Sequence, residues 1–128
     1  MIKQVFQIEH YWRVIIYYDI DYNSFSIVEG ELESLGIPKQ TRDQIYNAIN
    51  NRYAKAFTIS NSKHKTTITG FVKHKSKADY INSIVHEAEH IKQHILKYYK
   101  VDDKGEKPAY TIGFVVMKMF DVFYKLLQ

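Results

Sequence analysis

The sequence predicts an α+β domain, with a small antiparallel sheet and short helices in its N-terminal part and two longer helices at its C-terminal end. Three observations predict this fold class. Alternating apolar and β-branched residues fill the first 20 positions and return between residues 56 and 72. Apolar residues recur at helical spacing over residues 77–99 and again over residues 108–127. The length of 128 residues suits one domain, which we expect to span residues 1–128.

Strands and short helices are predicted in alternation from the N-terminus onward. Residues 3–20 are expected to form one long strand or a hairpin, and the polar residues 21–24 end it. A capping box that begins at Ser26 opens a short helix, which stops at Gly36. A second box starts a helix over residues 41–52.

The second half of the chain is predicted to contain a hairpin and then the two long helices. Residues 56–60 and 66–72 have the composition of strands, and a short polar turn joins them. A third capping box begins at Ser76 and opens a helix that can continue to about Tyr99. The last helix runs to near Leu127 and carries Pro108 in its first turn, where proline is tolerated.

The composition excludes several classes of protein. The chain has 7 Phe and 11 Tyr, which is typical of a packed globular domain. It has no Cys, so disulfides are excluded and any metal must be held by His, Asp or Glu. The opening residues carry charges spread among apolar ones, unlike a signal peptide, and no segment is long enough to cross a membrane. We therefore expect a cytoplasmic protein.

The net charge of +4 is a mild excess that favours acidic partners or nucleic acid. Its distribution argues against nucleic acid. Five lysines between residues 63 and 77 gather around the predicted hairpin, without the interleaved arginines and aromatic rings of a strand-binding groove.

The motif that carries chemistry is His86-Glu87-Ala88-Glu89-His90, an HExxH sequence on the predicted helix. Four residues of helix turn the chain by about 40° beyond a full circle and raise it by about 6 Å, so the two imidazoles project from one face. That geometry suits a single zinc ion. In proteins that use the motif, the glutamate after the first histidine takes a proton from the metal-bound water, and here that residue is Glu87.

The helical wheel of the motif helix gives two interpretations. His86, His90 and His94 lie on one side, opposite an apolar stripe. The stripe consists of Ile81, Ile84, Val85, Ala88, Ile91 and Ile95. A metal site that lines a cleft needs such a histidine face, but a solvent-exposed polar face has the same pattern, so periodicity leaves both open.

A zinc site needs at least a third protein ligand, and Glu106 is the first candidate. It is predicted to lie beside the apolar face of the last helix, on which the small residues Ala109 and Gly113 would permit close approach of the two helices. That face consists of Ala109, Ile112, Val116, Phe120 and Leu127. An acidic residue at a helix start is also favoured by the helix dipole alone.

Reaching the metal places a condition on the two helices. If the motif helix runs to Tyr99 and the next packs straight back, Glu106 lies about 14 Å beyond the level of His90. The motif helix should then end early, or the two helices should cross steeply. The alternative third ligands are His94, Asp102 and Asp103.

The motif and the Glu106-x-x-Ala109-Tyr110 sequence after it resemble the gluzincin branch of zinc metallopeptidases. The spacing is similar to that of minimal gluzincins and of small metallopeptidase-like proteins of phages and mobile elements. The resemblance covers about residues 76–116. The metzincin pattern does not fit, because its third histidine would fall at Leu96 and its glycine at Gln93.

The resemblance implies a zincin-like fold and a set of roles. His86, His90 and Glu106 would bind Zn2+, with water in the fourth position, and Glu87 would act as general base and then as general acid. Tyr110 is the candidate for stabilising the transition state, with a buried core tyrosine as the alternative. A strand over residues 66–72 would bind the substrate in an extended form.

Two functions follow as expectations. The first is a zinc-dependent peptidase that acts on a peptide or protein substrate. The second is a non-catalytic, zincin-like binding or regulatory protein of phage or mobile-element origin. The many tyrosines favour the second function, because exposed tyrosine is common at interfaces, including those of homodimers.

Overall fold

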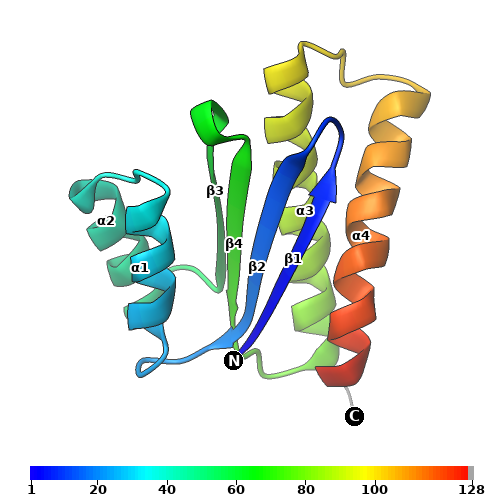
Figure 1. Cartoon of the computed structure of the whole chain (residues 1–128). Coiled ribbons are helices and arrows are strands. Elements are labelled where there is room, and N and C mark those ends of the chain that lie inside the picture. Colours follow the sequence, from blue (N-terminus) through cyan, green and yellow to red (C-terminus); the bar gives the residue numbers. More distant parts are fainter. Residues whose placement is uncertain (127–128) are drawn as a thin grey trace. The chain divides into compact units, whose positions relative to one another are not determined.

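The computed structural model describes residues 1–126 and has the predicted α+β class, with one four-stranded sheet and four α-helices in that part of the chain (Figure 1). The chain divides into two compact units, one from Met1 to His74 and one that begins at Lys75. The first unit holds the sheet and two helices, and the second holds the other two helices. Each is described by itself, and one domain over residues 1–128 stays a prediction.

The strands of the first unit form two hairpins. Strands β1 (Ile2–Ile8) and β2 (Trp12–Ile20) pair antiparallel, which decides between the single strand and the hairpin expected for this segment. Strands β3 (Ala56–Asn61) and β4 (Thr66–Val72) form the second predicted hairpin, joined by the 3₁₀ turn η1 (Ser62–His64).

The sheet is mixed and not purely antiparallel as predicted. Its strand order is β1-β2-β4-β3, and β2 runs parallel to β4, with Ile15 opposite Ile68. The chain leaves β2 through α1 (Phe25–Ser34) and α2 (Lys39–Asn50) before it returns as β3. This crossover lets β4 lie beside β2 in the same direction, which a chain of hairpins alone cannot do.

Both short helices begin two or three residues before their predicted starts. Ser24 precedes α1 and exchanges hydrogen bonds with Asp21, whose carboxylate accepts from the Ser24 N–H at 2.8 Å. The predicted capping residue Ser26 therefore lies inside the helix. Pro38 precedes α2, so the predicted box at Thr41 is also internal. The predicted stop at Gly36 is confirmed by its φ of 83°, a conformation that glycine adopts without strain.

Helices α1 and α2 lie on one face of the sheet within the first unit (Figure 1). The core between them is apolar and closed by partly buried side chains of α2 and β3. Its buried members are Ile15, Tyr17, Ile20, Phe25, Val28, Leu32, Leu35, Ile37 and Ile68. The packing of these residues holds α1 against strands β2 and β4.

The second unit consists of α3 (Lys77–Tyr99) and α4 (Glu106–Leu126), which pack side by side. The predicted cap of α3 is confirmed, because the Ser76 hydroxyl accepts a hydrogen bond from the Asp79 N–H at 3.1 Å. The predicted end of α4 near Leu127 lies outside the described residues. Within the described chain, no helix combines the length and apolar character that a membrane crossing requires.

The buried face of α4 differs from the predicted one. The observed face is formed by Pro108, Thr111, Val115, Met119 and Phe123. It is shifted by one residue from the predicted face, and one residue corresponds to a rotation of about 100° around the helix. Ala109 and Gly113 are consequently exposed, and a side chain built on Gly113 would meet nothing within 4 Å. The predicted close approach of the helices at these two residues is therefore wrong.

Candidate metal centre

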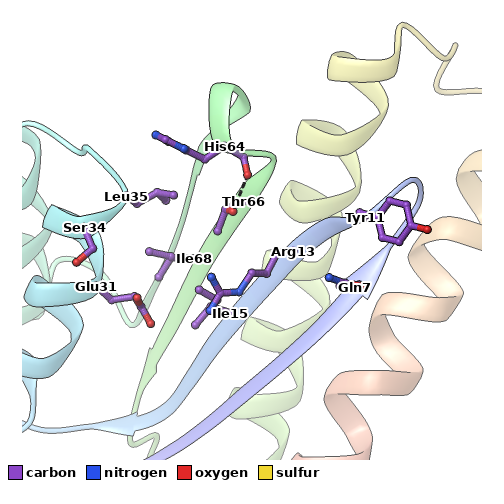
Figure 2. A pocket seen from close by; sticks show the side chains of 10 residues that line it. All are labelled: Gln7, Tyr11, Arg13, Ile15, Glu31, Ser34, Leu35, His64, Thr66 and Ile68. Atoms are coloured by element: carbon purple, nitrogen blue, oxygen red, sulfur yellow. Dashed lines mark hydrogen bonds between the residues drawn. The ribbon is translucent and has the colours of Figure 1, made fainter.

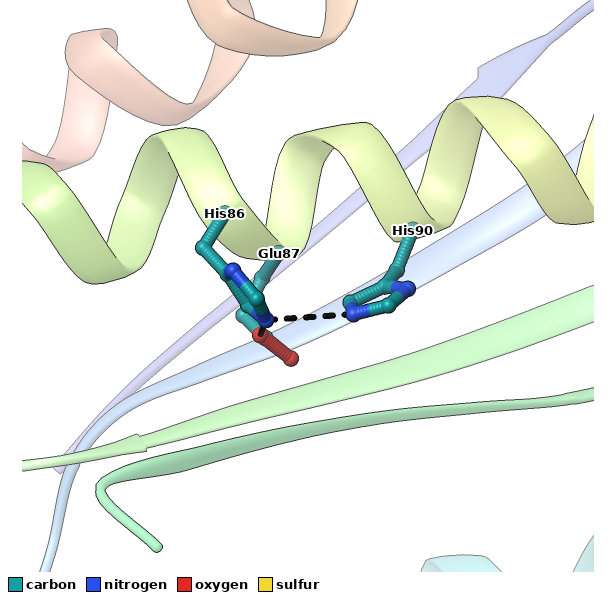
Figure 3. A group of neighbouring side chains, drawn as sticks. All are labelled: His86, Glu87 and His90. Atoms are coloured by element: carbon teal, nitrogen blue, oxygen red, sulfur yellow. Dashed lines mark hydrogen bonds and ion pairs between the residues drawn. The ribbon is translucent and has the colours of Figure 1, made fainter.

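The candidate metal centre lies in the middle of α3, where His86, Glu87 and His90 come together. One ligand atom from each of these side chains lies within 4.8 Å of the others. Figure 3 shows the two imidazoles extending from the same side of the helix, with the carboxylate beside them. The helical spacing of one turn between the two histidines produces this arrangement, as the motif predicts.

The two imidazoles present their Nε2 atoms to each other at 3.1 Å. For an ion about 2.05 Å from both nitrogens, the usual zinc–imidazole distance, the angle between the two nitrogen–ion bonds would be roughly 100°, close to the tetrahedral value. Without an ion, the two Nε2 atoms form a hydrogen bond in which the tautomers decide which ring is the donor. The same two atoms can therefore hydrogen-bond or bind one metal ion without a change of rotamer.

Glu87 is the buried member of the group. Its side chain is 6% exposed, against 68% for His86, and its Oε2 lies 3.9 Å from His86 Nε2. Buried carboxylates are rare unless they have polar partners. A carboxylate beside the metal-binding atoms of a histidine pair is suited to accept and return protons there.

The apolar stripe behind the motif agrees only partly with the prediction. Ile84, Ala88, Ile91 and Ile95 are buried, as predicted. Val85 is 47% exposed, which contradicts its predicted place in the stripe. The buried side of α3 is thus turned away from Val85, and it includes Glu87 from the motif itself.

His94 lies one turn beyond His90 but outside the group that the structure brings together. Its ring centroid is 6.5 Å from that of His90, with the planes at 44°. Burial, and then the neighbouring His90 and Lys97, lower the pKa of His94, which favours the neutral imidazole. As expected for successive turns of one helix, the third ring diverges from the point that the first two share.

Glu106 is not brought to the two histidines in this arrangement. It is the first residue of α4 and is exposed. The rings of Tyr80 and Phe123 are in contact, at 5.0 Å between centroids, and counting residues from this pair along two antiparallel helices puts Gly113 at about the level of His90. Glu106 then lies seven residues, or roughly 10 Å, further along the axis. The role of Glu106 as third ligand stays a prediction.

The physical reason lies in both helices. α3 does not end early but continues to Tyr99, so the first of the two conditions that would bring Glu106 close is not met. The buried face of α4 begins at Pro108, which leaves Glu106 on the outer side instead of the predicted core side.

The other predicted candidates lie apart from the group. Asp103 pairs with Lys92, at 2.9 Å between Nζ and Oδ1, and Asp102 is exposed. Tyr110 is 72% exposed, which excludes the alternative of a buried core tyrosine. Its role as a transition-state stabiliser stays a prediction.

A buried lysine is the feature of this region that sequence reasoning missed. The Lys92 side chain is 9% exposed and binds both Glu89, at 2.7 Å, and Asp103. Burial alone would lower the pKa of Lys92, but the hydrogen bonds to the two carboxylates outweigh it and raise the pKa. The i,i+3 spacing of Glu89 and Lys92 was the local signal, whereas the contact with Asp103 depends on how the loop folds back.

Compared with known protein families, curated proteins and solved structures, the chain matches none.

Proposed function

We propose that this protein is a zinc-dependent peptidase in which His86 and His90 hold the ion and Glu87 moves the proton. The observation that carries the proposal is the pair of Nε2 atoms 3.1 Å apart beside a buried carboxylate. Two imidazoles in this position are spaced for one tetrahedral ion. The proposal thus rests on the sequence motif and also on this placement of the two nitrogens and the carboxylate, which a solvent-exposed histidine face would not require.

The donor atoms of the group suit zinc. They are two imidazole nitrogens and one carboxylate oxygen, in a chain that has no thiolate. Zinc accepts nitrogen and oxygen ligands of this kind, whereas calcium and magnesium prefer oxygen alone. The two histidines would hold the ion through Nε2, which leaves Nδ1 of each ring as the protonated nitrogen.

Glu87 would supply the acid–base chemistry. A bound zinc ion lowers the pKa of water towards neutrality and polarises a carbonyl group. The Glu87 carboxylate lies next to the metal-binding face, so it can take a proton from water there and give it to the departing amine. Its burial holds the carboxylate in place and keeps bulk water from competing for that proton.

A non-catalytic metal-binding protein is the second candidate, and one observation favours it. Among the described residues, the group contains two histidines and Glu87 but no third ligand from another element. Catalytic zinc sites usually have three protein ligands. The exposed tyrosines, among them Tyr11, Tyr53 and Tyr124, also suit a protein that acts through contacts with a partner.

The test combines a metal analysis with peptide hydrolysis by wild type and Glu87→Gln. We expect about one zinc per chain in both proteins, and a loss of cleavage by about a hundredfold or more in the variant, the usual contribution of a general base. Glu89→Gln is the matched control, because Glu89 lies on the same helix but pairs with Lys92. Equal activity of Glu87→Gln and wild type would contradict the mechanism. Zinc binding without cleavage of any peptide in a library would select the second candidate.

A further inference from the structure

A polar hollow of about 350 Å³ lies within the first unit, between the sheet and α1 (Figure 2). Arg13 and Glu31 are among its polar lining residues, and Ile15, Leu35 and Ile68, which border it, belong to the buried core. This volume is at the lower end of the range for small-ligand sites, roughly 300–1,000 Å³. Seven of its ten lining residues carry polar groups, so the lining suits a polar ligand.

Arg13 brings a positive charge to the hollow, and this charge contributes to lowering the pKa of Glu31. It projects from β2, and its guanidinium forms no hydrogen bond or ion pair with another residue of the part of the chain described. The guanidinium carries N–H donors in a planar fork that matches the two oxygens of a carboxylate. The free fork therefore favours an anionic group in the hollow.

Glu31 offers one free acceptor on the opposite wall. Its Oε1 accepts hydrogen bonds from the Tyr17 hydroxyl at 2.9 Å and from the Lys3 ammonium at 2.8 Å. Its Oε2 has no partner among residues 1–126. The two donors fix the carboxylate and balance its charge, while Oε2 can still accept an N–H from a ligand.

We propose that the hollow binds an α-amino acid unit that has a free carboxylate. The unit is either a free amino acid or the C-terminal residue of a peptide. The Arg13 fork binds the carboxylate, and Glu31 Oε2 accepts the N–H on the adjacent carbon. This site is separate from the histidine pair and needs no metal, so it is independent of the proposed peptidase function.

The charges favour a carboxylate over a phosphate group. Arg13 is the one fixed cation among the lining residues described and forms no hydrogen bond or close ion pair with a carboxylate there, and Lys3 is already paired with Glu31. A phosphate dianion would face the Glu31 carboxylate with only one arginine to balance it. A monoanion with a neighbouring N–H uses both walls of the hollow.

The test is an NMR titration of the metal-free protein with three probes: leucine, N-acetyl-leucine and leucinamide. We expect at least one of the two carboxylates to bind with shifts at Arg13 and Ile15, and leucinamide, which lacks the carboxylate, to bind about tenfold more weakly or not at all. Tighter binding of leucine would identify the free amino acid as the ligand. Tighter binding of N-acetyl-leucine would identify the peptide C-terminus.

Arg13→Gln should weaken binding of the preferred carboxylate by about tenfold or more, since it removes the charge and the fork. Arg52→Gln is the matched control, an exposed arginine outside the lining, and should bind like wild type. Unchanged thermal unfolding of both variants shows that the fold is kept. Equal binding of leucinamide, equal binding by Arg13→Gln, or no binding of any probe would overturn the proposal. His86→Ala should bind the probes like wild type, which separates this outcome from failure of the metal site.

Discussion

The ammonium of Lys92 lies 2.9 Å from the carboxylate of Asp103, and this contact ties the α3–α4 loop to the side of α3. Lys92 lies two residues after His90, so this contact holds the loop against α3 at a point just beyond the candidate metal centre along the helix. Glu106 begins α4 three residues after Asp103.

Asp103→Ala should lower the free energy of unfolding by about 1–2 kcal/mol. The variant leaves the buried ammonium of Lys92 with Glu89 as its remaining carboxylate partner, and a buried charge that loses a partner is destabilising. Asp102→Ala, an exposed neighbour in the same loop, is the control and should cost little. Urea unfolding of the three proteins measures the difference, and equal stability of the two variants would show that the tie is unimportant.

Glu106→Gln should change zinc affinity by less than about twofold, because the described arrangement places Glu106 roughly 10 Å along the axis from the level of His90. Competition with a chromogenic chelator measures this affinity. A fall of tenfold or more would mean that α4 moves when metal binds, and it would support the ligand role that the sequence predicts. Hydrogen exchange of the α3–α4 loop with and without zinc would then show the movement.

Gly70→Ala should destabilise the protein by about 1–3 kcal/mol through overpacking. A methyl group at this position in β4 would lie closer than 3 Å to side-chain atoms of Phe57 and Ile20. Gly30→Ala is the opposite case, because a methyl group there meets nothing within 4 Å and alanine favours the helix. Gly30→Ala should therefore stabilise by about 0.5–1 kcal/mol. Thermal unfolding of both variants checks the two signs, and a stabilised Gly70→Ala would contradict the packing described for the sheet.

Glu31 should make stability depend on pH in the acid range. The hydrogen bond from Lys3, followed by that from Tyr17, lowers the pKa of Glu31 below 4.5, against the opposing effect of burial. A carboxyl whose pKa is lower in the folded state stabilises above its unfolded pKa, and this contribution is lost as pH falls through the folded value. Glu31→Gln should cost about 1 kcal/mol at neutral pH, and this cost should shrink as the pH falls through the lowered pKa of Glu31. Glu33→Gln, on the exposed side of the same helix, should show no such change, and a constant cost for Glu31→Gln at all pH values would contradict this account.

Helix starts were predictable from sequence only where the capping residue was the last polar group before the helix. Ser76 meets this condition and caps α3 as predicted. Ser26 also has the pattern of a capping residue, but the exchange of hydrogen bonds between Asp21 and Ser24 begins α1 earlier. Local patterns compete, and the sequence alone does not show which of two neighbouring caps forms the more complete set of bonds.

The histidine pair was predictable because it depends on one helix, whereas its third ligand depends on the packing of two. α4 has apolar residues on most of its sides, so its wheel permits several buried faces, and the face that begins at Pro108 is the one formed. The resulting rotation leaves Glu106 exposed. The burial of Lys92 was equally hidden, because it requires Asp103 to fold back across the loop.

The most direct test of the account is a zinc titration of the metal-free protein by calorimetry, with His90→Ala and His64→Ala as variants. We expect the wild type to bind one zinc per chain. The zinc affinity of His90→Ala should be lower by about tenfold or more, because one of the two converging nitrogens is lost. His64→Ala, which removes an exposed histidine of the first unit, should bind zinc like wild type. A wild type that takes up no zinc, or equal affinity in the two variants, would contradict the central claim that His86 and His90 form a metal site.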